Sequence, residues 1–126
     1  MQPSDELTYL MALTRLYGNR LRAEYQLLDH YGSAVEVWKH LNETGKKAVL
    51  EQVQREEEFI EKHQIKVLCR EDSAYPYRLR ECPDAPVLLY GKGNFDSNAG
   101  KMVSVVGTRN CSERGKDLTR KLVLDL

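Results

Sequence analysis

The sequence predicts an α+β to α/β fold in which a small helical domain precedes the beginning of a parallel sheet. Apolar residues in the first half recur at helical spacing, as Leu7, Leu10 and Met11 do over residues 5–17. By contrast, residues 65–69, 87–90 and 102–106 are short runs rich in β-forming side chains. The last run is nearly all apolar, which is typical of a strand covered on both faces.

Residues 1–63 are expected to form four or five helices, because breaks in the helical pattern fall at loop-forming residues. The expected helices lie over about 5–17, 20–31, 33–41 and 46–63. Gly32 is a suitable residue to end the second helix. Ser33 and Glu36 have the spacing of a capping box, in which the hydroxyl accepts from the backbone of Glu36 and the carboxylate reaches back. Trp38 is expected in the core.

Residues 64–126 have a different character and are expected to form a second, incomplete unit. The motifs Tyr75-Pro76 and Asp84-Ala85-Pro86 are expected to fix the chain where it enters the strands. A last helix is expected from Glu113, with a buried stripe formed by Leu118, Leu122 and Leu126. One covered strand and one helix cannot complete an α/β sheet, so we expect a truncated chain or a sheet shared with a partner copy.

The composition fits a soluble globular protein, with 41% hydrophobic residues and a formal net charge of zero. No stretch approaches the roughly 20 apolar residues of a membrane helix, and the N-terminus has no secretory pattern, so a cytoplasmic location is expected. Residues 1–63 hold 8 basic and 11 acidic side chains, and residues 64–126 hold 11 and 8, which mildly favours the second half as the partner of a polyanion. The three cysteines and three histidines lack ligand spacing, so free thiols and no metal are expected.

The segment with the clearest chemical signal is residues 103–115, which read as a strand, a glycine turn and a helix start. Open amides at a helix N-terminus form an anion site, and Gly107 would let a phosphate approach the backbone. Thr108 and Ser112 offer hydroxyls, and Arg109 offers a planar fork that can hold a phosphate through two hydrogen bonds. Further positive charge follows from Arg114, Lys116, Arg120 and Lys121.

The turn itself is not specific. It matches neither the G-x-G-x-x-G dinucleotide fingerprint nor a Walker loop, because the required glycines and the G-K-[ST] ending are missing. A strand-to-helix turn with an exposed arginine explains the same residues, so phosphate binding and a purely structural turn both remain open at this point.

Three blocks, taken in order, resemble the DNA-processing protein A family (DprA, also called Smf). They are Tyr75-Pro76-x-x-Leu79, Asp84-x-Pro86-x-x-Leu89 with Gly91, and Val-Val-Gly107-Thr-Arg109-x-x-Ser112-x-x-Gly115 after an apolar strand. One departure is Arg114, where the family usually has an aromatic residue. A larger departure is that the glycine-rich second half of the family's domain, and any C-terminal winged helix, are absent from this sequence.

The resemblance implies a sterile-alpha-motif-like (SAM-like) helical domain over 1–63 and an incomplete Rossmann-like parallel sheet over 64–126. It implies a protein that binds and protects single-stranded DNA and helps load the RecA recombinase during natural transformation and recombination. Arg109 would be the principal phosphate clamp, with Gly107, Thr108 and Ser112 lining the site. No catalytic residue and no cofactor are implied, and the full-length protein would form a homodimer.

Two alternatives remain open. A Rossmann-like turn also suits a nucleotide-binding hydrolase of the lysine-decarboxylase-like family, although that family needs a second glycine-rich motif that this sequence does not contain. Alternatively, residues 1–63 act as a protein-interaction module. Cys111 lies in the turn but has no histidine nearby in the sequence to activate it, so it is expected to be a spectator.

Overall fold

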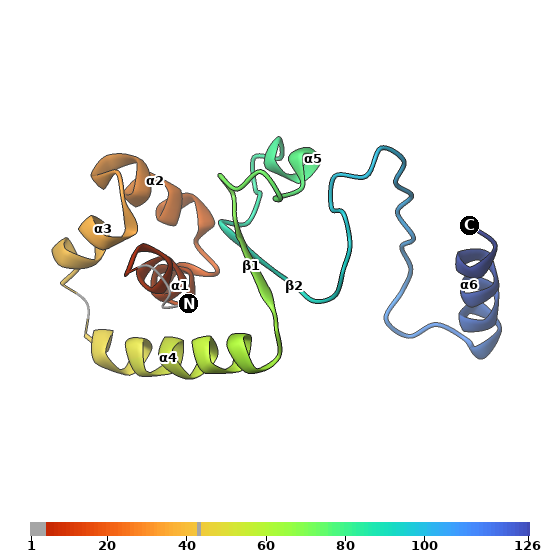
Figure 1. The fold of residues 1–126 in the computed structure, drawn as a ribbon, viewed down its shortest axis with the longest axis horizontal. Helices are drawn as coiled ribbons and strands as arrows, with labels where there is room; N and C mark the ends of the chain where they lie inside the picture. The colour runs from red at the N-terminus through yellow and green to blue at the C-terminus, as the bar shows by residue number, and fades with distance from the viewer. Residues whose placement is uncertain (1–4, 43) are drawn as a thin grey trace.

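The computed structural model describes residues 5–42 and 44–126. Residues 1–4 and Glu43, which belong to the expected helical domain, lie outside the described residues. Four helices come first, followed by a small hairpin-like sheet and a final helix that lies apart from the rest (Figure 1). The elements are α1 (Asp5–Tyr17), α2 (Leu21–Tyr31), α3 (Ala34–His40), α4 (Lys46–Lys62), β1 (Lys66–Cys69), α5 (Tyr77–Arg80), β2 (Leu88–Gly91) and α6 (Glu113–Asp125).

The first four helices confirm the sequence prediction. Each helix begins and ends within one residue of its expected position. Gly32 follows α2 in the left-handed conformation, with φ of 81°, and donates its N–H to the Leu28 carbonyl at 2.8 Å. A side chain at that φ would be strained, which explains why a glycine ends the helix there.

The predicted capping box at the start of α3 is half correct. The Ser33 hydroxyl accepts from the Glu36 backbone N–H at 3.2 Å, as expected. The Glu36 carboxylate does not reach back; it accepts from the Lys39 ammonium at 2.6 Å instead. Another element supplies an acceptor for the two amides that follow Ser33 at this helix end.

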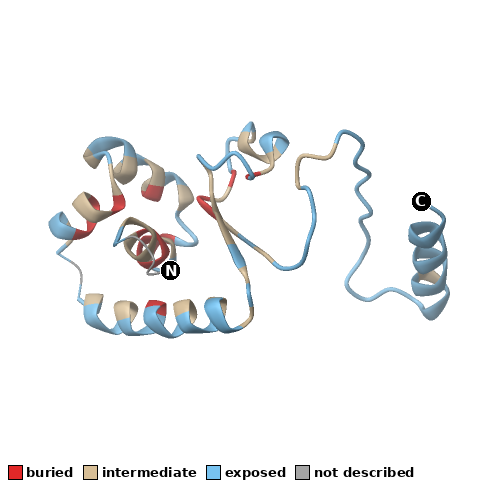
Figure 2. Ribbon diagram, viewed as in Figure 1, coloured by how far each residue is buried: buried red, intermediate tan, exposed pale blue. Residues whose placement is uncertain are grey.

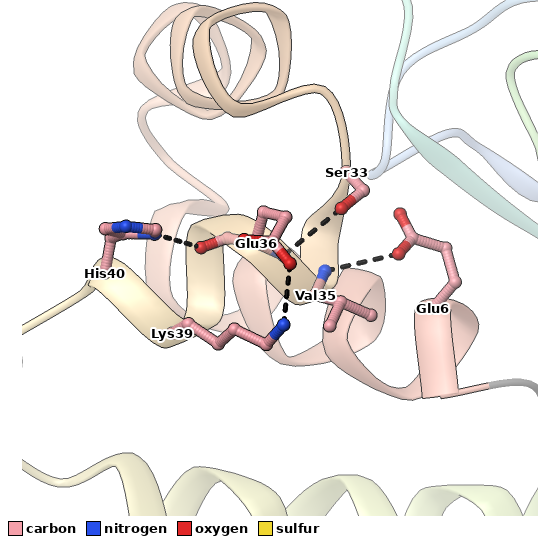
Figure 3. Close-up of polar contacts among 6 residues, drawn as sticks. All are labelled: Glu6, Ser33, Val35, Glu36, Lys39 and His40. Atoms are coloured by element: carbon pink, nitrogen blue, oxygen red, sulfur yellow. Dashed lines mark hydrogen bonds and ion pairs between the residues drawn. The ribbon is translucent and has the colours of Figure 1, made fainter.

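That acceptor is Glu6 of α1. Its carboxylate accepts from the backbone N–H of Ala34 at 2.6 Å. It also accepts from the backbone N–H of Val35 at 3.2 Å, as Figure 3 shows. A carboxylate at the N-terminus of a helix satisfies open amides and opposes the positive end of the helix dipole. The first turn of α1 therefore fixes where α3 begins.

The core lies around α1, which runs between the other helices (Figures 1 and 2). Met11, Ala12 and Leu13 of α1 are at most 1% exposed, and Trp38 of α3 is buried as predicted. The core continues beyond the helices. Its buried members are Leu10, Met11, Ala12, Leu13, Tyr17, Ala34, Val37, Trp38 and Val53 from the helices, with Val87 and Leu88 from the hairpin.

The sheet consists of β1 and β2 paired antiparallel, with Lys66 opposite Gly91 and Cys69 opposite Leu88. The expected parallel arrangement is therefore wrong for these two strands. Parallel neighbours need a crossover connection, usually a helix of several turns. The connection here holds only the single turn of α5, and it brings the chain back beside β1.

The motifs Tyr75-Pro76 and Asp84-Ala85-Pro86 fix this connection, as the sequence predicted. Tyr75 is fully buried, and its hydroxyl donates to the Pro86 carbonyl at 2.7 Å. Asn98 closes the same loop from further along the chain: its side-chain oxygen accepts from the Tyr77 amide at 2.8 Å. The Asn98 amide group also donates to the carbonyls of Ser73 and Tyr75, at 3.2 Å each.

Beyond this loop the chain differs from the expected buried strand and helix stripe. Residues 102–106 run extended without a sheet partner, and Val106 is 89% exposed. Leu118 and Leu122 of α6 are more than half exposed, and Leu126 is exposed as well. Residues 105–111 flank α6 across an open groove, and the other helices and the sheet lie apart from α6 (Figure 1), so these apolar side chains remain exposed. A Rossmann-like parallel sheet remains a prediction.

Glu24 of α2 is a charged residue in an unusual position, since it is only 1% exposed. One carboxylate oxygen accepts from the Thr14 hydroxyl at 2.7 Å, and the other makes no hydrogen bond within the described residues. Burial raises the pKa of Glu24 above its ordinary value of 4.5, because the charged form loses water.

We expect Glu6→Gln to lower the free energy of unfolding by about 1 kcal/mol, because the charge-assisted cap on α3 is lost. Urea denaturation followed by circular dichroism measures the change. Asp5→Asn is the matched control, since Asp5 is exposed in the same first turn of α1 and its side chain makes no hydrogen bond or ion pair with the described residues of α3. Equal stability of the two variants would show that the Glu6 contact contributes nothing.

We expect Glu24→Gln to stabilise the protein at pH 7. The raised pKa means that the folded state disfavours the carboxylate, so its cost is present above the unfolded pKa near 4.5 and disappears below it. The gain in urea midpoint over the parent should therefore shrink as the pH falls towards 4. The control is Glu51→Gln on the exposed face of α4, and a pH-independent gain for Glu24→Gln would contradict the assignment.

Candidate nucleic-acid interface

The predicted phosphate turn leads directly into α6, which begins at Glu113 as expected. Every residue from 101 to 126 is exposed except Gly115, which is half-buried. The turn and the helix therefore present their side chains to solvent (Figure 2). An extended polyanion could reach all of them without any part of the described chain moving aside.

Ser112 is the N-cap of α6, a role that the sequence analysis did not assign to it. Its hydroxyl oxygen accepts from the Gly115 backbone N–H at 3.1 Å. One of the amides expected to be open is thus occupied, whereas those of Glu113 and Arg114 make no hydrogen bond within the described residues. The Ser112 hydroxyl still has its proton to donate, so capping and phosphate contact are compatible.

Arg109 is exposed and makes no hydrogen bond or ion pair with any described residue. Its guanidinium is therefore not held inward by a carboxylate, which is the condition that a phosphate clamp requires. Gly107 is exposed too, and a Cβ built on it would meet nothing within 4 Å. Crowding within the described chain does not explain a glycine at position 107.

An open groove of about 540 Å³ lies between residues 105–111 and α6. Of the predicted site residues it brings together Gly107, Thr108, Lys116 and Arg120. Three others do not line it, and these are Arg109, Ser112 and Arg114. Arg109 therefore adjoins the groove only through its sequence neighbour Thr108, and the structure does not gather all seven residues into one pocket.

The basic side chains of α6 are partly neutralised by their own helix. Lys116 pairs with Glu113 at 2.8 Å, and Arg120 approaches Asp117 at 3.5 Å. Such exposed pairs are worth at most about 1 kcal/mol and are screened by salt, so a phosphate can compete for these cations. Arg114 has no such partner among the described residues.

Sequence reasoning gave no role to Tyr77 and Arg78 of α5. The Arg78 guanidinium lies 4.6 Å from the centre of the Tyr77 ring. It also donates to the carbonyls of Ala99 and Gly100, at 3.4 Å each, and contacts the Met102 sulfur at 3.5 Å. This arginine thereby anchors the chain where it leaves for the turn, and only its position after Tyr-Pro would have pointed to it.

The cysteines, the possible metal ligands and the apolar character of the helices give no further feature of this site. Cys111 is exposed in the turn, and burial raises the pKa of the Cys69 thiol to about 11, which keeps it protonated. Within residues 5–42 and 44–126, no three His, Cys, Asp or Glu side chains gather as metal ligands. None of the described helices has the length and apolar character needed to cross a bilayer.

Comparison with known proteins identifies a family and a relative to which the chain is similar. Residues 66–126 match the family model described as DNA recombination-mediator protein A. Over 55 residues the chain is 46% identical to a protein named DNA processing protein DprA from Streptococcus pneumoniae (strain ATCC BAA-255 / R6). That match covers 44% of this chain and 20% of the relative, so the chain spans well under two thirds of the relative's length. No solved structure matches the chain significantly.

The family match begins at β1 and includes α5, β2, the turn and α6. It contains all three blocks on which the resemblance was based, and so confirms that resemblance. The four helices before residue 66 lie outside it, so the SAM-like character of the helical domain stays a prediction.

We expect Ser112→Ala to loosen the first turn of α6, because the Gly115 amide loses its acceptor. A lost N-cap costs about 1 kcal/mol, which corresponds to roughly fivefold faster hydrogen exchange at the Gly115 amide. Exchange measured by NMR on the whole protein detects this change. Ser104→Ala is the control, since Ser104 is exposed and its hydroxyl makes no hydrogen bond within the described residues. Unchanged exchange in Ser112→Ala would argue against the cap.

Proposed function

Because residues 66–126 match the family model described as DNA recombination-mediator protein A, we propose that this chain belongs to that family and that the whole protein binds single-stranded DNA and mediates its recombination. Contact is made mainly with the phosphates, at the turn 107–112 and the start of α6. The protein protects the bound strand and helps to load the RecA recombinase on it, in natural transformation and related recombination. It works in the cytoplasm as a homodimer, without a cofactor and without catalysing a reaction itself.

Two observations carry this proposal: the guanidinium of Arg109 has no partner among the described residues, and four residues further along the chain α6 begins with the open amides of Glu113 and Arg114. Each amide offers a directed N–H donor, and the helix dipole adds a partial positive charge. The guanidinium offers two parallel donors that match phosphate geometry. Thr108 and Lys116, which line the adjoining groove, extend the donor surface along the path of a strand.

The chemistry of this surface supports binding without base preference. Residues 107–126 hold five basic and three acidic side chains, so their net charge is positive. All of the proposed donors recognise phosphate oxygens, which are the same for every base. Binding of this kind releases counterions and weakens steeply as salt rises.

The roles in RecA loading and in transformation rest on the family, whose description names recombination mediation. The similar streptococcal protein is named for DNA processing. No contact within residues 5–42 and 44–126 identifies a recombinase surface or a dimer face. These roles are accordingly proposed for the whole protein and not for residues 107–126 alone.

We expect Arg109→Ala in the whole protein to weaken binding of a fluorescent single-stranded oligonucleotide at least tenfold at moderate salt, because a bidentate phosphate contact is lost. Arg109→Lys should recover part of the affinity, since the charge remains without the fork. The slope of log affinity against log salt should fall by about one for Arg109→Ala. Fluorescence anisotropy measures all three quantities.

The matched control is Arg55→Ala, which removes an exposed arginine from α4, away from the turn (Figure 1). Its affinity for the oligonucleotide should equal that of the parent. If Arg109→Ala bound as tightly as Arg55→Ala, the turn would not be the phosphate site.

A further inference from the structure

A second groove, of about 500 Å³, lies on the helical side of the molecule between α1, α4 and the start of β1. Its apolar lining comes from three elements and consists of Leu7, Met11, Ile60, Ile65 and Val67. Met11 is 1% exposed and forms the floor, while the other four are half-buried. A groove with this lining can accept apolar side chains from a partner.

The rim of this groove is acidic. Glu57, Glu58 and Glu61 line it along α4, together with the neutral side chains of Gln54 and Gln64, and no lysine or arginine of the described residues lines it. Glu57 is already engaged, since it accepts from the Thr8 hydroxyl at 2.5 Å. Glu58 and Glu61 are exposed and make no side-chain hydrogen bond or ion pair with the described residues. Two carboxylates are therefore available beside an apolar floor.

We propose that this groove binds a cationic amphipathic helix from a partner protein. Such a helix places leucine-like side chains every three to four residues on one stripe and lysine or arginine on the flanks. The apolar stripe of this helix would pack against the apolar lining of the groove. The flanking cations would form ion pairs with Glu58 and Glu61. These two carboxylates are three residues apart on α4 and so lie on the same face of that helix.

The negative charge of the groove rim favours a cationic helix over other classes of partner. Nucleic acid and anionic membrane surfaces are polyanions, which three carboxylates repel. A second copy of this chain docking here symmetrically would bring the same acidic rim face to face with itself, which is also unfavourable. A cationic helix is the partner class that both the floor and the rim favour.

The groove is separate from the proposed DNA surface. The helices α1 and α4 lie at the opposite end of the molecule from α6 (Figure 1). Their surfaces also have opposite charge, since the turn and α6 are net positive and the groove rim is negative. The protein could hold a DNA strand and a partner helix at the same time.

The test uses the whole protein and a synthetic helical peptide made of leucine and lysine, with an otherwise identical peptide in which glutamate replaces lysine. We expect the leucine–lysine peptide alone to bind in isothermal titration calorimetry, with weaker binding as salt rises. The double variant Glu58→Lys, Glu61→Lys should bind it about tenfold more weakly, since two attractions become repulsions. Glu51→Lys, exposed on α4 but outside the groove lining, should bind as the parent does.

Several outcomes would overturn the proposal. They are no binding of the leucine–lysine peptide, equal binding of the leucine–glutamate peptide, or equal binding by the double variant. Concentration-dependent self-association that the double variant changes would assign the groove to a second copy instead. Arg109→Ala should leave peptide binding unchanged, so failure here and failure of the DNA proposal can be told apart.

Discussion

The arrangement depends on the burial of Val87 and Leu88 among the helices. These residues come from the second half of the chain, yet they are 3% and 5% exposed and belong to the same core as Met11 and Trp38. Burying such a side chain contributes about 1.5–3 kcal/mol. Because β1 pairs only with β2 in the described chain, this contact positions the whole hairpin, and with it the loop from which the chain leaves for the turn.

The helical half was predictable because its signals are local. The spacing of apolar residues, the glycine at position 32 and the serine at position 33 act within a few residues of themselves, and the structure has helices where they indicate. The Glu6 cap was not predictable, because its partners Ala34 and Val35 are distant in the sequence. Similarly, the place of Val87 and Leu88 in the helical core depends on a contact that no local pattern encodes.

The second half shows how much a strand depends on its neighbours. Residues 102–106 have the composition of a buried strand, and α6 has a leucine stripe, but both are exposed because no described segment pairs with or covers them. The candidate site was predictable in its residue types and its position before α6. Its geometry was not, since the capping role of Ser112 and the separation of Arg109 from the adjoining groove arise from the course of the backbone.

The anchor formed by Arg78 and Asn98 has a mechanical consequence. If DNA binds at the turn as proposed, a pull on the DNA would transmit tension along residues 102–106. The tension would reach the carbonyls of Ala99 and Gly100, where Arg78 holds the chain. From there the load would pass to the Asn98 bonds with Ser73, Tyr75 and Tyr77. The helical core would bear little of it, so pulling on bound DNA would disturb this polar junction well before it unfolded the helices.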